Sequence, residues 1–226
     1  KLWDELYAPF GIRAFHAGST GTQMGGWFRK EIRSLEDLKG LKFRAPGNQG
    51  RVLAKLGVTP VTLPGGEIFP ALQSGAIDAA EWIGPADDLN LGLQTIWKNY
   101  YLQGLHQSTD IGEILINKAV WDKLAPDLKE IIRTAAMASM METYTFNVYR
   151  NAQAIVRLRN EFNVTIHDTP KDFFPEFVRA TNVVLDRYAA KDAFFKEVLD
   201  SQRNFAKVVV PYWTKINDLY SNLGNA

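Results

Sequence analysis

The chain has 226 residues, of which 46% are hydrophobic and 23% are charged, and its formal net charge is +1. These values are ordinary for a globular protein of one or two domains, and so small a net charge argues against a nucleic-acid partner. The chain has no cysteine, which excludes disulfides, thiolate nucleophiles and cysteine zinc sites, and it has no apolar run near the ~20 residues that span a bilayer.

The first half of the chain alternates candidate strands and helices. Trp3, Leu6 and Tyr7 stand at helical spacing, and Pro9 ends this short helix, which has neither the apolar core nor the cleavage site of a signal peptide. Further strands are expected at 12–16, 27–29, 41–44, 58–63 and 76–82, and helices at 34–38, 47–56 and 65–72. This alternation predicts an α/β sheet with parallel neighbouring strands.

The second half is mostly helical. One strand at 112–117 and a short helix at 119–124 precede a segment from Asp127 to about Phe162 without glycine or proline. Its apolar residues keep a helical period, which predicts one helix of roughly 35 residues where about 11–12 is usual. The remaining expected elements are a strand at 165–167, a helix at 173–190 and a helix at 193–223 that Pro211 breaks.

Sequence motifs for catalysis or for phosphate binding are not found. His16, His106 and His167 are far apart in the chain, and each is more simply explained as a structural residue than as a ligand or base. The glycine-rich pieces GSTGTQMGGWF and PGNQG match no phosphate-binding pattern and are typical of turns. No nucleophile-elbow motif is present.

Four residues have groups suited to holding a small anion and a cation. Arg44 ends a predicted strand, where its guanidinium could bind a carboxylate through two hydrogen bonds, or could simply pair with an acid at the surface. Gln23, Glu81 and the Trp82 carbonyl offer hard oxygen ligands of the kind that Na⁺ or Ca²⁺ accepts. Glu81 could instead form a salt bridge with Arg44, and Trp82 could be a core residue.

Three segments carry a resemblance to a known family. GSTGTQMGGWFRKEIRSLEDLKGLKFR, LAKLGVTPVTLPGGEIFPALQSGAIDAAEW and GPADD resemble the substrate-binding subunits of TRAP transporters, the tripartite ATP-independent periplasmic systems. The run GGWFRKEI is typical of the branch that binds 2-oxo acids and lactate. The resemblance covers nearly the whole chain. It implies a periplasmic-binding-protein-like α/β fold, with two lobes joined by crossing strands and a long helix.

The resemblance also implies a function. Such a protein is a periplasmic receptor, not an enzyme, that captures a small organic acid and delivers it to TRAP membrane subunits. The carboxylate-binding arginine of the family falls on Arg44. A bridging cation, Na⁺ or Ca²⁺, is held in this branch by residues that fall on Gln23, Glu81 and the Trp82 carbonyl.

Two candidate substrate-binding residues depart from the pattern of the branch. Ser19 stands where asparagine is common, and its hydroxyl can still donate a hydrogen bond. Gln107 stands where an acid is common, which removes a negative charge near the ligand. The identity of the acid and the charge of the cation therefore stay open.

Family members begin with a signal peptide and with elements that build most of the first lobe, whereas this chain starts just before the first crossing strand. We therefore expect residues 1–21 and 108–146 to be the remnant of an incomplete first lobe, and residues 22–107 and 147–226 to form the second lobe. A chain with one complete wall of the cleft should bind its ligand weakly.

Related receptors sometimes dimerise through the last helix. The corresponding helix here has an apolar stripe, which could equally pack on its own lobe; the stripe comprises Phe205, Val208, Val209, Tyr212, Trp213, Ile216, Leu219 and Tyr220. Two other functions stay open, an enzyme on a similar two-lobe fold and the ligand-sensing domain of a regulator. The first would need an acid–base pair in the cleft, and the second a neighbouring DNA-binding module.

Overall fold

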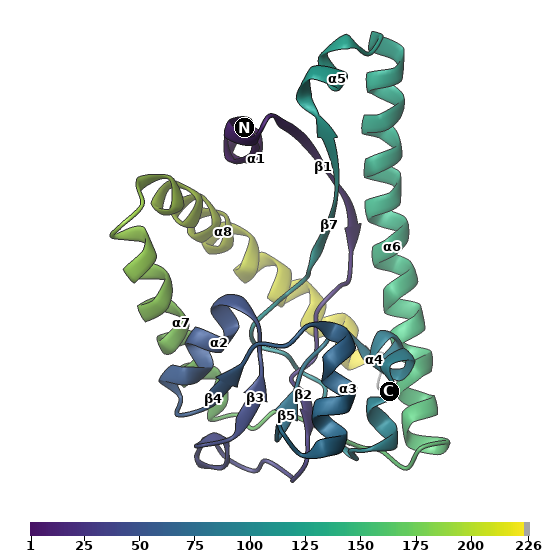
Figure 1. The fold of residues 1–226 in the computed structure, drawn as a ribbon, viewed down its shortest axis with the longest axis vertical. Helices are drawn as coiled ribbons and strands as arrows, with labels where there is room; N and C mark the ends of the chain where they lie inside the picture. Colours follow the sequence, from purple (N-terminus) through teal and green to yellow (C-terminus); the bar gives the residue numbers. More distant parts are fainter. Residues whose placement is uncertain (224–226) are drawn as a thin grey trace. The chain divides into compact units, whose positions relative to one another are not determined.

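The computed structural model describes the backbone of residues 1–223 and the side chains of residues 1–218. The chain forms two compact units, one from Lys1 to Ala180 and one that begins at Thr181. Helices and strands alternate through most of the first unit (Figure 1), so the α/β class is confirmed. Within the described residues, none of the helices combines the length and the apolar character needed to cross a membrane.

A six-stranded sheet with the order β4-β3-β5-β2-β6-β8 forms the centre of the first unit. Its strands are β2 (Gly26–Phe28), β3 (Lys42–Arg44), β4 (Thr59–Val61), β5 (Ala79–Ala80), β6 (Asn99–Tyr101) and β8 (Thr165–His167). The expected parallel neighbours are found for β3 with β4 and β5 and for β6 with β8. The prediction is wrong for β2, which is antiparallel to β5 and β6, since β2 leads into β3 without a crossover α-helix.

Short helices connect these strands. They are α2 (Gly47–Lys55), α3 (Gly65–Ser74) and α4 (Pro85–Leu91), with 3₁₀ turns at Leu35–Leu38 and Leu93–Thr95. The expected helix at 34–38 is thus a 3₁₀ turn, in which the Asp37 carboxylate accepts from the Ser34 N–H at 3.1 Å. The expected strand at 76–82 shrinks to the two residues of β5. Neither α4 nor β6 was predicted, because neither has the apolar period of its type.

Aromatic residues cover both faces of the sheet. Trp27 and Tyr100 lie on one face with ring centroids 4.3 Å apart, and they pack against Ile68 and Leu72 of α3. Phe28 and its neighbours on the other face make edge contacts, as expected when side chains alternate along strands. Side chains therefore pack on both faces of the sheet and keep the ends of its strands in fixed positions.

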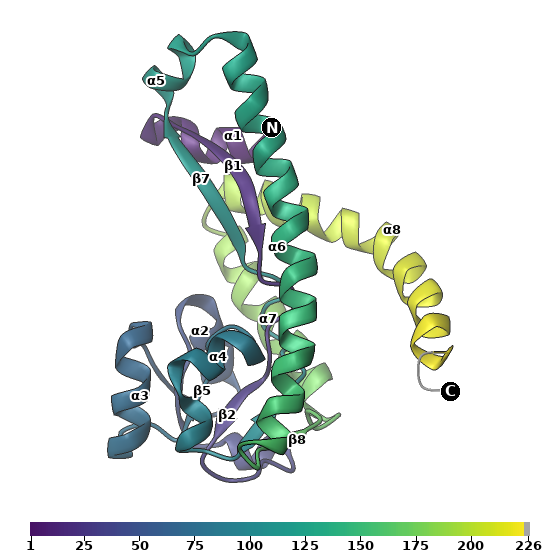
Figure 2. The same ribbon diagram turned by 90° about the vertical axis from the view of Figure 1, so that its right-hand side faces the viewer.

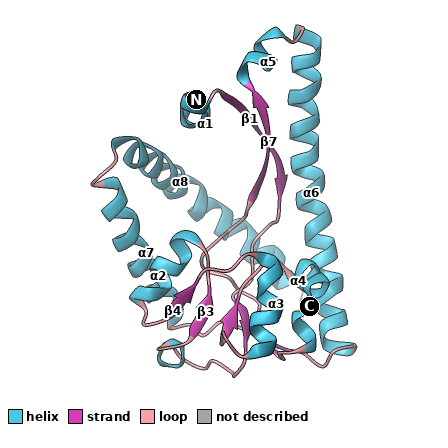
Figure 3. Cartoon of the chain, in the orientation of Figure 1, coloured by secondary structure: helices cyan, strands magenta, loops and turns pink. Residues whose placement is uncertain are grey.

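A second, two-stranded sheet consists of β1 (Ile12–Ser19) and β7 (Ile111–Asn117), which are antiparallel. Its register shifts between His16 and Gly18. The helix α6 (Pro126–Asn160, 35 residues) runs along this pair (Figures 1 and 2), which confirms the predicted long helix. Figure 3 shows the pair as the long magenta strands above the shorter strands of the main sheet. The helices α1 (Leu2–Tyr7) and α5 (Lys118–Lys123) flank it, with a 3₁₀ turn at Ala8–Phe10.

The second unit is helical. It contains the end of α7 (Phe173–Ala189) and all of α8 (Ala193–Leu223). Arg203 of α8 donates hydrogen bonds to Asp186 and Asn182 of α7, each at 2.8 Å. The prediction that Pro211 breaks the last helix is wrong. The helix continues through it, because a proline removes only one of the many backbone hydrogen bonds of a long helix.

Candidate ligand-binding site

The candidate site lies where two parallel strands of the main sheet end. Arg44 is the last residue of β3, and it pairs with Ala80, the last residue of β5, so that Glu81 follows directly beside it. Ligands of open α/β sheets bind at this edge. Arg44 and Glu81 are only 5% and 3% exposed, so the alternative of a surface arginine is wrong.

Arg44 forms hydrogen bonds with Glu81, the residue that follows β5. Its Nη1 lies 2.6 Å from Glu81 Oε1 and 2.8 Å from the Glu81 carbonyl oxygen, while Nε donates to the Leu63 carbonyl at 3.1 Å. The salt bridge that the sequence left open is therefore present. Among the described residues, no acceptor of the protein binds Nη2 of Arg44, so this group has hydrogens left to donate.

Trp82 lies against the same guanidinium. The carbon of the Arg44 guanidinium is 5.4 Å from the centroid of the indole ring, a cation–π distance. A Cβ at Gly65 would come within 2.5 Å of the Trp82 ring, so the ring needs a glycine at the start of α3. Trp82 is half-buried and packs on the edge of the core, which agrees with the alternative of a core residue, while its carbonyl as a cation ligand stays a prediction.

Gln23 and His106 complete the buried cluster. The Nε2 atom of His106 lies 3.5 Å from Glu81 Oε2 and 3.4 Å from Gln23 Oε1, and its side chain is 5% exposed. Because both partners are acceptors, Nε2 carries the hydrogen. Sequence reasoning missed His106, since a single histidine in an irregular loop carries no motif.

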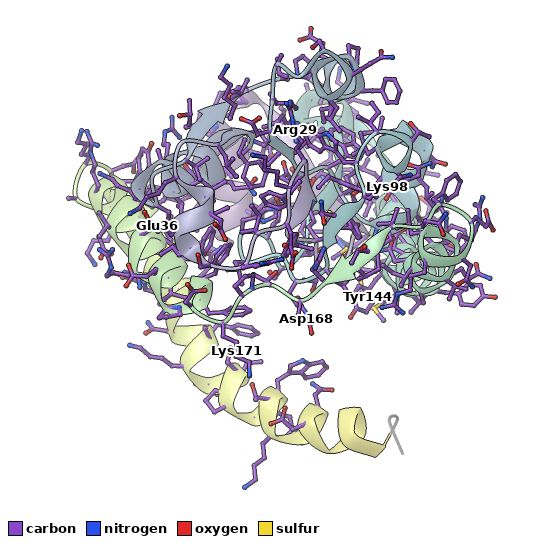
Figure 4. All side chains as sticks on the ribbon, turned by 90° about the horizontal axis from the view of Figure 1, so that it is seen from below. Arg29, Glu36, Lys98, Tyr144, Asp168 and Lys171 are labelled. Atoms are coloured by element: carbon purple, nitrogen blue, oxygen red, sulfur yellow. The ribbon has the colours of Figure 1, made fainter. Side chains whose placement is uncertain are left out.

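The loop with His106 is fixed by its neighbours. A Cβ at Gly104 would lie 2.2 Å from the Gln23 carbonyl oxygen, so only glycine allows the loop to pack against Gln23. Gln103 receives a hydrogen bond from the Thr169 N–H at 2.7 Å and donates to Asp168. Figure 4 shows Asp168 on the outside of this region, with its side chain directed away from the ribbon.

Of the two remaining candidates, only Gln107 is joined to this cluster. The backbone carbonyl of Gln107 accepts from the Gln23 N–H at 3.2 Å, which places residue 107 next to the site. Ser19 ends β1, and its hydroxyl is 2.7 Å from the hydroxyl of Thr109 and accepts from the Gly21 N–H at 3.2 Å. No contact joins Ser19 to Arg44 or Glu81.

The oxygen atoms fit an alkali or alkaline-earth cation better than a transition metal. Glu81 Oε2 and Gln23 Oε1 lie 3.5 Å and 3.4 Å from the same His106 nitrogen, so the two oxygens are close together, and both are hard donors. Within the described part of the chain, no group of three His, Cys, Asp or Glu side chains could hold a metal. A cation here would therefore need Trp82 or ligand oxygens to complete its coordination.

Asp88 supports the Glu81–Trp82 segment from inside. It is fully buried, and its carboxylate accepts from the Trp27 indole N–H at 2.7 Å and from the Ile83 N–H at 3.2 Å. Burial raises the pKa of Asp88 to about 7, although these two hydrogen bonds act in the opposite direction. Burial and the nearby Asp88 carboxylate raise the pKa of Tyr100 well above its usual range.

Comparisons with known proteins identify the family of the chain. A model of the DctP family, described as bacterial extracellular solute-binding protein family 7, matches residues 2–192. A monocarboxylate 2-oxoacid-binding periplasmic protein of Nostoc sp. is 38% identical over 223 residues, covering 98% of this chain and 61% of the Nostoc protein. The chain thus spans less than two thirds of that relative.

Two solved structures have the same fold. A TRAP periplasmic solute-binding protein from Colwellia psychrerythraea, with bound calcium and pyruvate, is 38% identical with a TM-score of 0.90. The alignment covers 100% of this chain and 68% of that one. Its counterpart from Pseudoalteromonas atlantica, with bound sodium and pyruvate, is 37% identical with a TM-score of 0.87, covering 97% and 67%. The predicted periplasmic-binding-protein-like fold is thereby confirmed, and the chain belongs to bacterial extracellular solute-binding protein family 7.

Proposed function

We propose that this protein is a periplasmic receptor that captures a small 2-oxo or 2-hydroxy monocarboxylate with a bridging Na⁺ or Ca²⁺ and delivers it to TRAP membrane subunits. The observation that carries the proposal is the buried Arg44–Glu81 pair at the carboxyl ends of β3 and β5. Family membership and the ligands of the two solved relatives support it.

The charges of the site fit the capture of an anion. Arg44 and Glu81 neutralise each other, so an acid bound at Nη2 of Arg44 would leave one buried negative charge. A cation held by Glu81 Oε2, Gln23 Oε1 and the Trp82 carbonyl would balance it, which avoids the large cost of burying an unpaired charge. Ser19 and Gln107 would contact the ligand from β1 and from the loop after β6.

An enzymatic role has little support. The buried cluster contains no serine, cysteine or lysine nucleophile beside a base, and the family is one of solute-binding proteins. The assignment of residues 1–21 and 108–146 to a first lobe, and of residues 22–107 and 147–226 to a second, remains part of the proposal. So does a periplasmic location, for which the Nostoc relative is the argument.

Titration calorimetry of the protein at its natural length tests the proposal. Pyruvate, lactate and a longer 2-oxo acid are titrated in buffers with Na⁺, with Ca²⁺, or with neither cation after chelation. We expect binding of at least one acid that depends on the cation. Binding that survives removal of both cations would contradict the role of Glu81 and Gln23, and failure of every acid would contradict the receptor function.

We also propose that α8 mediates a homodimer. Phe205, Val208, Tyr212 and Trp213 are exposed, whereas Val209 and Ile216 are half-buried. The side chains of Leu219 and Tyr220 lie outside the described residues. Exposed apolar stripes of this kind mark interaction surfaces. Light scattering should give twice the monomer mass for the wild type and the monomer mass for Val208→Glu with Trp213→Glu; a monomeric wild type would refute the dimer.

A further inference from the structure

The helix α6 presents a row of polar side chains to the segments that lead into the site. Ser139, Thr143, Asn147 and Asn151 recur every four residues and therefore share one face. We call this row the α6 ladder. Each member bonds a backbone atom outside α6. Ser139 donates to the Ala17 carbonyl at 2.7 Å, and Thr143 accepts from the Ser19 N–H at 3.0 Å. Asn147 donates to the Ser19 carbonyl at 2.9 Å, and Asn151 accepts from the Ala86 N–H at 3.0 Å.

Two of these bonds fix the end of β1. Thr143 accepts from the Ser19 N–H, and the amide of Asn147 donates to the Ser19 carbonyl. Ser19 pairs with Ile111 just beyond the shift in register between His16 and Gly18. The helix therefore holds both backbone polar groups of a candidate substrate-binding residue, just after an irregularity in the strand pairing.

The last member of the ladder fixes the segment after Trp82. Asn151 Oδ1 accepts from the N–H of Ala86 in the first turn of α4, an amide that α4 itself cannot satisfy. A Cβ at Gly84 would lie 2.9 Å from Asn151 Oδ1, so the contact depends on a glycine there. With Asp88 bonded to Ile83, the segment that carries Glu81 and Trp82 is held from two sides.

We infer that Asn147 and Asn151 are positioning residues, which set Ser19 on β1 and the Glu81–Trp82 segment at a fixed distance for ligand binding. A regular α-helix advances ~1.5 Å per residue, so α6 acts as a rigid spacer between the two contacts, which are ~6 Å apart along its axis. The inference rests on the proposed function, because it assigns to these two asparagines a part in holding the proposed ligand.

The chemistry of the two amides gives an asymmetric test. Asn151 accepts a hydrogen bond, so Asn151→Asp keeps the contact, whereas Asn151→Ala loses it. Asn147 donates a hydrogen bond, so both Asn147→Ala and Asn147→Asp lose it. In Asn147→Asp, a carboxylate, which cannot donate, would face the Ser19 carbonyl. The control is Gln153→Ala on the exposed face of α6, where Gln153 bonds only Tyr149 of the same helix.

Affinity for pyruvate in the presence of Na⁺ or Ca²⁺ is measured by calorimetry on the protein at its natural length. We expect Asn151→Ala, Asn147→Ala and Asn147→Asp to weaken binding about three- to tenfold, the effect of one net hydrogen bond. Asn151→Asp and Gln153→Ala should bind like the wild type. Equal loss in Asn151→Asp and Asn151→Ala, or wild-type affinity in all variants, would overturn the inference.

Amide hydrogen exchange without ligand separates the inference from the proposed function. The Ala86 amide should lose protection in Asn151→Ala but keep it in Asn151→Asp and in Gln153→Ala. If the wild type binds no acid, the proposed function fails, and the exchange pattern alone then supports or overturns the ladder. Unchanged protection of Ala86 in Asn151→Ala would overturn it in either case.

Discussion

Arg44 and Glu81, 37 positions apart in the chain, form a buried ion pair in which Nη1 of the arginine contacts both a carboxylate oxygen and the carbonyl oxygen of the glutamate. Their side chains are 6% and 3% exposed. The pair joins the ends of β3 and β5, and it therefore stabilises the sheet edge at which the ligand is expected. Removing either partner should consequently affect folding as well as binding.

Breaking the pair should destabilise the protein. Arg44→Ala leaves the Glu81 carboxylate buried without its partner, which typically costs ~3–5 kcal/mol of unfolding free energy. The double variant Arg44→Met with Glu81→Leu should recover much of this loss, because a buried ion pair can often be replaced by apolar groups. Urea denaturation measures the stability, and calorimetry should show no acid binding in either variant. A loss below ~1 kcal/mol in Arg44→Ala would contradict this account.

His106 should contribute to binding through its N–H group. His106→Ala removes the donor shared by Glu81 and Gln23, so we expect weaker acid binding, by about tenfold. His106→Gln can still donate and should retain most of the affinity. His16→Ala, on β1 against Trp3, serves as the control. Equal affinities of His106→Ala and the wild type would exclude His106 from the site.

The neutral Gln107 should favour a monovalent cation. With Arg44 and Glu81 cancelling each other, a monocarboxylate and Na⁺ balance, whereas Ca²⁺ leaves one excess positive charge. Gln107→Glu should therefore shift the preference toward Ca²⁺, by about tenfold. Competition calorimetry with both cations measures the shift, and Gln202→Glu on α8 adds the same charge as a control. An unchanged preference in Gln107→Glu would refute the charge argument.

Asp88 should make stability depend on pH. Burial raises its pKa to about 7 from the ordinary value of 3.8, so the folded state binds more protons than the unfolded state between these values. The unfolding free energy should therefore fall as pH rises from about 4 to 7 and level off above, at up to ~1.4 kcal/mol per pH unit.

The variant Asp88→Asn should flatten this dependence, while Asp87→Asn on the same helix should keep it. Denaturation curves at half-unit pH steps compare the three proteins. If wild type and Asp88→Asn show the same slope between pH 4 and 7, the buried carboxyl does not titrate as described.

Much of the fold follows from local sequence. Gly75 ends α3 with a left-handed backbone, φ 74°, which glycine adopts without strain, and the position of this stop is visible in the sequence. The 35 residues of α6 follow from an unbroken helical period without glycine or proline. By contrast, β6 and α4 have weak local signals, and packing of Tyr100 and Asp88 into the core stabilises them.

The candidate site, too, can be predicted only in part from the sequence. The residue type and the strand-end position of Arg44 and Glu81 are readable from the sequence, as is the hard-oxygen character of Gln23. The contacts of His106 are not, because they join a loop residue to partners 25 and 83 positions away, for which no sequence period exists. The role of Gln23, Glu81 and Trp82 as cation ligands stays a prediction.

The sequence by itself determined the α/β class, the long helix and the chemical types available at the strand ends, because helical period, strand alternation and glycine stops are properties of neighbouring residues. Only the tertiary structure decided that β2 is antiparallel, that Arg44 and Glu81 are paired, and that α6 bonds Ser19 and Ala86. Each of these depends on contacts between distant segments, whose free energy arises only when the whole sheet and helix assemble.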